Sequence, residues 1–162
     1  SDYPDSMLYR YDNVITLRTF SKAYGLGGLR LGYGLAHKDL IENLNKVKAP
    51  FEPSMPAQAA GIAALDDNDF LEKTVRENQI EREHLLNEFK SLNIEFIVSY
   101  TNFITTIWDN SEDADVIVNK LLNKGIIVRK LSSFGWQNCI RISIGTSEEN
   151  VTLLNALKSI IH

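Results

Sequence analysis

The sequence predicts an α/β protein in which a glycine-rich strand–loop–strand segment is joined by a long helix to a small α+β domain. Three observations lead to this prediction. Five of the nine glycines lie within ten residues, from Gly25 to Gly34, and apolar runs flank them. Residues 69–92 carry apolar side chains at the spacing of one helix face. After them, short β-branched runs alternate with helical patterns to the C-terminus.

The first part of the chain supplies two strands and two helices. Residues 14–17 are apolar and β-branched, so they predict a strand, and residues 29–36 predict a second one. Residues 38–48 show helical spacing of apolar residues. A loop with three prolines follows, and the alanine-rich residues 57–65 predict a helix that can pack closely against a neighbour.

The second part begins with the long helix. Asp69 and Glu72 fit a capping box at its start, and Thr146 with Glu149 fits a capping box at the last helix. Strands are predicted at residues 94–98, 103–108, 126–130 and 140–144, and helices at residues 113–123 and 151–161. The expected organisation is therefore residues 1–68 as one domain part, 69–92 as a linking helix and 93–162 as a small domain.

Composition narrows the class of protein. The chain has 162 residues, 44% of them hydrophobic, and a net charge of -4, which suits a soluble protein and argues against a general nucleic-acid binder. No apolar stretch is long enough to span a bilayer, and the three histidines are too far apart to predict a metal site. The single cysteine, Cys139, lies in an apolar run and is expected to be buried. The first residues lack a signal-peptide pattern, so a cytoplasmic location is expected.

The glycine-rich segment has the residues that a phosphate-bearing aldehyde cofactor would require. Lys22 offers an amine that can form an imine. Thr19, Ser21 and Arg30 offer two hydroxyls and a guanidinium for a phosphate. The glycines allow close approach of the backbone. Lysines near turns are usually solvated and glycine clusters often serve hairpins, so the residues alone leave a purely structural reading open.

Residues 21–33, Ser-Lys-Ala-Tyr-Gly-Leu-Gly-Gly-Leu-Arg-Leu-Gly-Tyr, resemble the lysine signature of class I/II (fold-type I) aminotransferases, most closely that of histidinol-phosphate aminotransferases. Gly27 stands where those enzymes usually have alanine. The resemblance implies a C-terminal fragment of the fold-type I large domain followed by a small α+β domain. It implies that Lys22 forms the internal aldimine with pyridoxal 5'-phosphate and then shuttles a proton. Thr19, Ser21 and Arg30 would hold the cofactor phosphate.

The resemblance continues in the second part of the chain. Residues 99–103, 125–129 and 140–150 are similar to three blocks of the same family. In the last block, the family's arginine grips the anionic end of the substrate, which implies that role for Arg141. Arg129 is a second candidate for substrate binding. Because it adjoins Lys130, and basic pairs at strand ends are often simply exposed, its assignment is weaker.

The implied activity is transfer of an amino group between histidinol phosphate and 2-oxoglutarate, in histidine biosynthesis. The expected partners are a small-molecule amino donor and a 2-oxo acid, with a homodimer for the full-length protein and neither nucleic acid nor membrane. The isolated chain should be inactive, because the family's ring-binding aspartate lies upstream of Ser1. An aromatic or broad-range aminotransferase and a threonine-phosphate decarboxylase remain alternatives, as does a non-catalytic module for effector binding or dimerisation.

Overall fold

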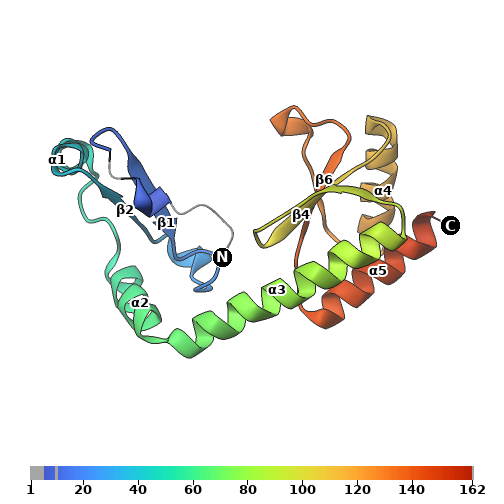
Figure 1. The fold of residues 1–162 in the computed structure, drawn as a ribbon, viewed down its shortest axis with the longest axis horizontal. Coiled ribbons are helices and arrows are strands. Elements are labelled where there is room, and N and C mark those ends of the chain that lie inside the picture. Colours follow the sequence, from blue (N-terminus) through green and yellow to red (C-terminus); the bar gives the residue numbers. More distant parts are fainter. Residues whose placement is uncertain (1–5, 10, 162) are drawn as a thin grey trace. The chain divides into compact units, whose positions relative to one another are not determined.

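The computed structural model describes residues 6–9 and 11–161, which fall into two compact units (Figure 1). The N-terminal unit comprises the described residues up to Val75, and the C-terminal unit those from Arg76 onward. Helix α3, Asn68–Ser91, contains the boundary between them. The division at residues 68 and 92 expected from the sequence stays a prediction. Within the described part of the chain, no helix combines the length and apolar character needed to cross a membrane.

The N-terminal unit consists of a two-stranded antiparallel ribbon, two helices and two short 3-10 turns. These elements are η1 Ser6–Leu8, β1 Ile15–Thr19, η2 Gly27–Leu29, β2 Gly32–Ala36, α1 Lys38–Val47 and α2 Met55–Asp66. The ribbon exposes apolar side chains on both faces, because Leu17 lies on one face and Leu35 on the other, with exposed fractions of 72% and 44%. Among the residues of β1, only Thr16 is buried.

Strand β2 is shorter than the sequence suggests, so the predicted strand at residues 29–36 is wrong at its beginning. Leu29 belongs to the turn η2, and Arg30 follows it with a φ of 54° in the left-handed region. A residue in that conformation cannot continue an extended strand. The strand therefore begins at Gly32.

Close approach of backbones explains two glycines of this unit. Gly32 pairs with Thr19, and a Cβ atom at Gly32 would lie 2.8 Å from the carbonyl oxygen of Arg18. Gly61, on the buried side of α2, packs so closely against Leu31 that an added Cβ would overlap its side chain. The predicted close packing of the alanine-rich helix is thus directed at the segment that precedes β2.

The C-terminal unit is a four-stranded antiparallel sheet with the strand order β3-β4-β6-β5, accompanied by helices. Its elements after α3 are β3 Glu95–Ile97, β4 Phe103–Ile107, α4 Ser111–Asn123, β5 Arg129–Lys130, η3 Ser132–Phe134, β6 Cys139–Ser143 and α5 Ser147–Ile161. Helix α5 runs alongside α3 (Figure 1), and Lys158 donates to Glu88 at 2.7 Å between them.

One face of this sheet carries the hydrophobic core. Ile104 pairs with Ile142, and Thr106 pairs with Ile140, so these side chains project to the same side. Side chains of α3, α4 and α5 complete the core; the largest fully buried apolar ones on these helices are Leu85, Phe89, Leu121 and Leu157. The other face of the sheet carries Arg141, which is half-buried.

Of the two capping boxes predicted from the sequence, the structure contains the one at the start of α5 and not the one at the start of α3. The predicted capping box at the last helix is confirmed, since Thr146 N donates to Glu149 Oε2 at 2.8 Å and Glu149 N donates to Thr146 Oγ1 at 3.4 Å. The box predicted at Asp69 is wrong. Asp67 caps α3 instead, because its Oδ1 accepts from Phe70 N at 3.1 Å.

Strand β5 is also shorter than predicted, with two residues in place of the expected 126–130. The reason is the end of α4. Gly125 adopts a φ of 79°, and Ile126 N donates to the carbonyl of Leu121 at 2.9 Å, as in a Schellman motif. The amide of Ile126 is therefore hydrogen-bonded to the end of α4 and not to a neighbouring strand, and strand pairing begins only at Arg129.

We predict that Gly32→Ala opens the ribbon, because the new methyl group would meet the backbone of Arg18, which cannot rotate away. The expected cost is roughly 1–3 kcal/mol, the usual range for overpacking. Amide hydrogen exchange at Phe20, whose N donates to Leu31 O at 3.2 Å, should become faster. Gly28→Ala is the matched control, since nothing lies within 4 Å of its added Cβ. Equal exchange rates in both variants would contradict this account.

Candidate active site

Three of the candidate cofactor residues, Ser21, Lys22 and Arg30, lie on one closed loop, residues 21–31, at the end of the β1–β2 ribbon, and Thr19 is the last residue of β1 before it. Pairing of Thr19 with Gly32 closes the base of the loop. Above it, Phe20 N donates to Leu31 O at 3.2 Å, and Leu26 N donates to Phe20 O at 3.0 Å. These bonds hold the loop in a defined shape.

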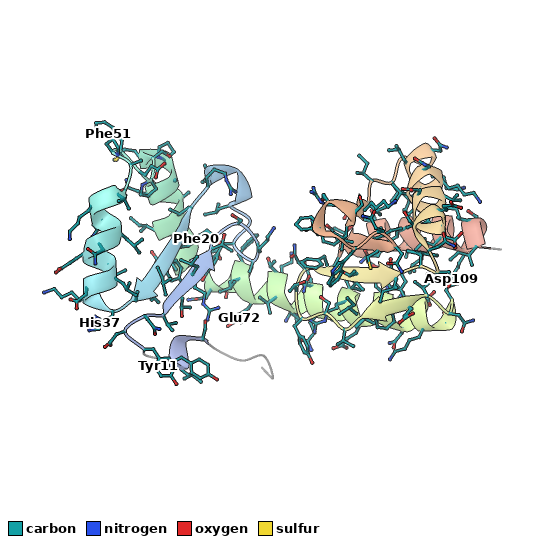
Figure 2. The ribbon with its side chains drawn as sticks, turned by 90° about the horizontal axis from the view of Figure 1, so that it is seen from above. Tyr11, Phe20, His37, Phe51, Glu72 and Asp109 are labelled. Carbon is teal, nitrogen blue, oxygen red and sulfur yellow. The ribbon has the colours of Figure 1, made fainter. Side chains whose placement is uncertain are left out.

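Phe20 fills the interior at the start of this loop. Its side chain, labelled in Figure 2, is buried. Its ring lies 4.9 Å from that of Tyr24 and 5.8 Å from that of Tyr33, centroid to centroid. Aromatic pairs at these separations favour tilted arrangements, as found here. Phe20 therefore fixes the chain immediately before the two residues that are expected to carry the chemistry, Ser21 and Lys22.

The two hydroxyl residues and the lysine follow each other around the turn. Thr19 Oγ1 accepts from the backbone N of Ser21 at 3.0 Å, so the Thr19 hydroxyl lies beside the Ser21 backbone. Lys22 O accepts from Gly25 N at 2.9 Å, which closes the next turn, and the Lys22 side chain is exposed. A lysine that must be neutral to attack an aldehyde needs shielding from water. The described residues of this chain do not provide that shielding.

Arg30 lies at the far end of the same loop, in the left-handed conformation. Its Nη1 donates to Gly27 O at 2.6 Å, which turns the guanidinium back over the loop. A guanidinium has five N–H donors, so others remain for an anion. Gly28 has free space beside it. One short segment thus contains an amine, two hydroxyls, a guanidinium and open glycine backbone, which are the groups that a phosphate-bearing aldehyde would require.

The candidate substrate residues lie together on the open face of the C-terminal sheet. Arg141 of β6 pairs directly with Thr105 of β4 on one side and with Arg129 of β5 on the other. Residues in direct register on neighbouring strands project from the same face. The sheet thus places two guanidinium groups in one row.

Each guanidinium lies over an aromatic ring. Arg141 Cζ is 5.1 Å from the ring centroid of Phe103, and Arg129 Cζ is 5.6 Å from that of Phe134. Neither arginine forms an ion pair with a carboxylate in the described parts of the chain. Like charges opposite each other in a sheet are destabilising. An anion bound between them would relieve that repulsion.

A groove of about 530 Å³ lies further along β6, between residues 125–128 and the turn into α5. Its lining includes Glu148 and Glu149, so its charge does not suit an anionic ligand. The arginine row is therefore the better candidate for substrate binding.

Asn150 fixes the turn that follows β6. This buried side chain accepts from Gly145 N at 3.0 Å, and its Nδ2 donates to Gly145 O at 3.1 Å and to Glu81 Oε2 at 2.8 Å. Both hydrogens of the amide are thereby used. The hydrogen bond from Asn150 holds the pKa of Glu81 below its ordinary value of 4.5.

Sequence reasoning missed several residues that shape both sites. Phe20, Phe103, Phe134, Lys130 and Asn150 received no role from the motifs. Cys139 was expected to be buried, and this is confirmed; burial raises the pKa of its thiol. The only sequence signal for Asn150 was its place after Glu148 and Glu149 in the last block that resembles the family.

We predict that Glu81 makes the C-terminal unit less stable in acid. The pKa of Glu81 in the folded chain is below its ordinary value of 4.5. Ionised Glu81 therefore stabilises the folded state fully above pH 4.5, and this stabilisation is lost as the pH falls through the pKa of the folded chain. Between pH 7 and pH 3, the unaltered chain should therefore lose more stability than Glu81→Gln. Urea unfolding followed by tryptophan fluorescence checks this, since Trp108 and Trp136 both lie in this unit.

Asn150→Ala removes the donor and should also reduce the pH dependence, but at a higher overall cost, because Gly145 loses its partners. Combining it with Glu81→Gln should remove little further pH dependence. If Glu81→Gln and the unaltered chain lost the same stability between the two pH values, Glu81 would have no such role.

Comparison with known proteins shows the family to which the chain belongs. The family described as aminotransferase class I and II matches residues 6–157. A histidinol-phosphate aminotransferase of Campylobacter jejuni is 51% identical over 148 residues, which cover 91% of this chain and 40% of that protein. Histidinol-phosphate aminotransferase 1 of Psychrobacter arcticus is 45% identical over 159 residues, 96% of this chain and 42% of that protein.

Solved structures show the same fold. The histidinol-phosphate aminotransferase of Sinorhizobium meliloti, in complex with pyridoxal-5'-phosphate, has a TM-score of 0.85 and 34% identity; the match covers 93% of this chain and 41% of that one. The chain thus spans about two fifths of the length of the relatives that it matches. Its large-domain part and small domain are those of fold-type I enzymes whose cofactor is pyridoxal phosphate, and the chain belongs to the class I and II aminotransferases.

Proposed function

We propose that this chain forms the C-terminal portion of an aminotransferase that transfers an amino group between histidinol phosphate and 2-oxoglutarate, in histidine biosynthesis. The names of the similar proteins from Campylobacter jejuni and Psychrobacter arcticus support this choice of substrate. Because the chain spans only about two fifths of those proteins, the activity is proposed for the full-length protein. The isolated chain should be inactive.

The observation that carries the proposal is the closed loop of residues 21–31. Lys22 lies in this loop next to Ser21, Arg30 lies near its far end, and Thr19 lies at its base, where its Oγ1 accepts from Ser21 N. Pyridoxal phosphate would supply an aldehyde and an electron-withdrawing ring. Thr19, Ser21 and Arg30 would bind its phosphate by charge-assisted hydrogen bonds, and Lys22 would hold it covalently. The shielding of Lys22 from water would have to come from parts of the full-length protein that the described residues do not include.

Lys22 is also the candidate for proton transfer. Its Nζ amine would take the proton from the carbon of the donor that loses its amino group and would deliver that same proton to C4′ of the cofactor. The Phe20 ring and the bond from Gly25 N to Lys22 O limit the movement of the backbone at this position. A general base works best when it is held close to the proton that it moves.

The arginine row supports an anionic substrate. Arg141 would grip the phosphate of histidinol phosphate in one half-reaction and a carboxylate of glutamate in the other, because a guanidinium matches both groups. Arg129 would provide the second positive charge. An aromatic or broad-range aminotransferase, or a threonine-phosphate decarboxylase, could use the same arginine, so the substrates need a direct test.

The remaining expectations concern the full-length protein. We propose a homodimer in the cytoplasm that acts on a small-molecule amino donor and a 2-oxo acid. A non-catalytic module for effector binding or dimerisation is the alternative of another class. It would have no need for a lysine, two hydroxyls and an arginine on one loop, so labelling of Lys22 separates the two.

We predict that Lys22 carries the cofactor in the full-length protein. Borohydride reduction of the cofactor-loaded protein followed by peptide mapping should find the label on Lys22. Lys22→Ala should remove the label and the transamination, whereas Lys38→Ala, at an exposed lysine of the same unit, should change neither. The 162-residue chain alone should show no turnover. A label on another lysine, with Lys22 unmodified, would overturn the assignment.

We predict that Arg141→Ala lowers kcat/KM by about a hundredfold or more for both histidinol phosphate and glutamate, because two charge-assisted hydrogen bonds are lost. Cofactor absorbance should remain, since Lys22 and Arg30 act on the cofactor. Arg141→Lys should restore only part of the loss, because an ammonium group cannot form the planar fork. Near-normal kinetics of Arg141→Ala for both substrates would make this arginine structural.

A further inference from the structure

Strand β5 is too short to explain by itself why Arg129 lies opposite Arg141. It contains two residues, which pair only with Arg141 and Ile140 of β6. Before β5, the amide of Ile126 donates to the carbonyl of Leu121 at the end of α4. After β5, the turn η3 begins at Ser132. With so few restraints from the sheet, a contact outside the sheet must help to fix the direction of Arg129.

Lys130 makes such a contact. The sequence places two basic residues side by side, but the pleat of the strand sends them to opposite faces. Arg129 is exposed on the open face, whereas the Lys130 side chain is only 19% exposed and reaches the first turns of α4. There its Nζ donates to Ser111 O at 3.4 Å, to Ser111 Oγ at 3.2 Å and to Asp115 Oδ1 at 2.5 Å.

These contacts suit positioning better than stabilisation. An ammonium group has three donors, and the three acceptors on α4 use them all. The Asp115 side chain is 54% exposed, and solvent screens ion pairs of that kind, so their effect on stability is small. Their geometric effect is larger, because three bonds in different directions fix the far end of the Lys130 side chain and, through it, the backbone of β5.

We propose that Lys130 is a positioning residue of the substrate site. By its bonds to Ser111 and Asp115, it holds β5 against β6, so that the Arg129 guanidinium stands over Phe134 and in the same row as Arg141. The inference rests on the proposed function, in which these two arginines bind the anionic group of the substrate.

The chemistry of the two substrates gives this role a specific signature. A phosphate monoester carries a charge near -2 and three acceptor oxygens, so it can use both guanidinium groups at once. A carboxylate carries one charge and two oxygens, and a single guanidinium fork can satisfy it. Misplacing Arg129 should therefore weaken binding of a phosphate-bearing substrate more than binding of glutamate.

The test uses Lys130→Met, which keeps the apolar length of the side chain and removes its bonds to α4. In the cofactor-loaded full-length protein, KM for histidinol phosphate should rise about tenfold, while KM for glutamate and kcat change little. Asp115→Asn should act in the same direction more weakly, and Lys130→Arg should restore part of the loss. Lys120→Met, at an exposed lysine of α4, is the control for the lost charge and should leave both KM values unchanged.

A second measurement does not depend on turnover. In the 162-residue chain, Leu131 N donates to Cys139 O at 2.9 Å beside β5. Hydrogen exchange of this amide should become faster in Lys130→Met and Asp115→Asn, while amides between β4 and β6 keep their rates. If Lys130→Met folds poorly, Asp115→Asn carries both measurements, because its side chain is more exposed.

The outcomes separate this inference from the function on which it rests. If Arg129→Ala raises KM for histidinol phosphate but Lys130→Met and Asp115→Asn do not, Lys130 has no positioning role. An equal rise of both KM values in Lys130→Met would also overturn it, since general destabilisation would explain that result. If Arg129→Ala and Arg141→Ala both leave binding unchanged while exchange at Leu131 still responds, the anion site is wrong and the proposed positioning falls with it.

Discussion

The pairing of β4 with β6 in one register is the constraint on which the C-terminal unit depends. Side chains alternate between the two faces of a strand, so a shift by one residue would exchange the faces. The observed register sends Ile140 and Ile142 into the core beneath the helices and leaves Arg141 in line with Thr105. Burial of the isoleucines therefore determines the direction of the arginine. A charged group on the core face would be costly, which makes the alternative register unfavourable.

The N-terminal unit depends on close backbone contacts in place of a large core. Phe20, Ala57 and Thr16 are buried in it, whereas most of its large apolar side chains are exposed. Gly32 allows the ribbon to close, and Gly61 allows α2 to press against Leu31. The loop with Lys22 is thus shaped by glycines at its base and by one aromatic ring inside it. Residues of the N-terminal unit determine the shape of this loop, but they do not shield Lys22 from water.

Much of this arrangement could be predicted from the sequence, because it depends on local patterns. The segment around Lys22, the strand with Arg141 and the capping box at Thr146 and Glu149 each follow from residues close together in the chain. The start of β2 could not be predicted in this way. Leu29 and Leu31 resemble strand residues, and nothing local shows that Arg30 between them adopts a left-handed conformation.

Contacts between distant segments were equally beyond local patterns. In the sequence, Arg129 and Lys130 form one basic pair. Only the pairing of β5 with β6 and its packing beside α4 show that the two side chains project from opposite faces of the sheet. Asn150 and Glu81 likewise meet only when α5 lies against α3. Lys22 is exposed, because the described residues do not contain the walls that would shield its amine from water.

The exposed ribbon of the N-terminal unit has a practical consequence for handling the isolated chain. In the described structure, β1 and β2 pair only with each other, so each has an outer edge with open backbone groups. Leu17 and Leu35 present apolar surface on the two faces, and Phe51 in a nearby loop is 98% exposed (Figure 2). Open edges with apolar flanks promote association between copies by edge-to-edge pairing. The chain produced alone should therefore aggregate through its N-terminal unit, and solubilising changes belong on the ribbon and not on the C-terminal sheet.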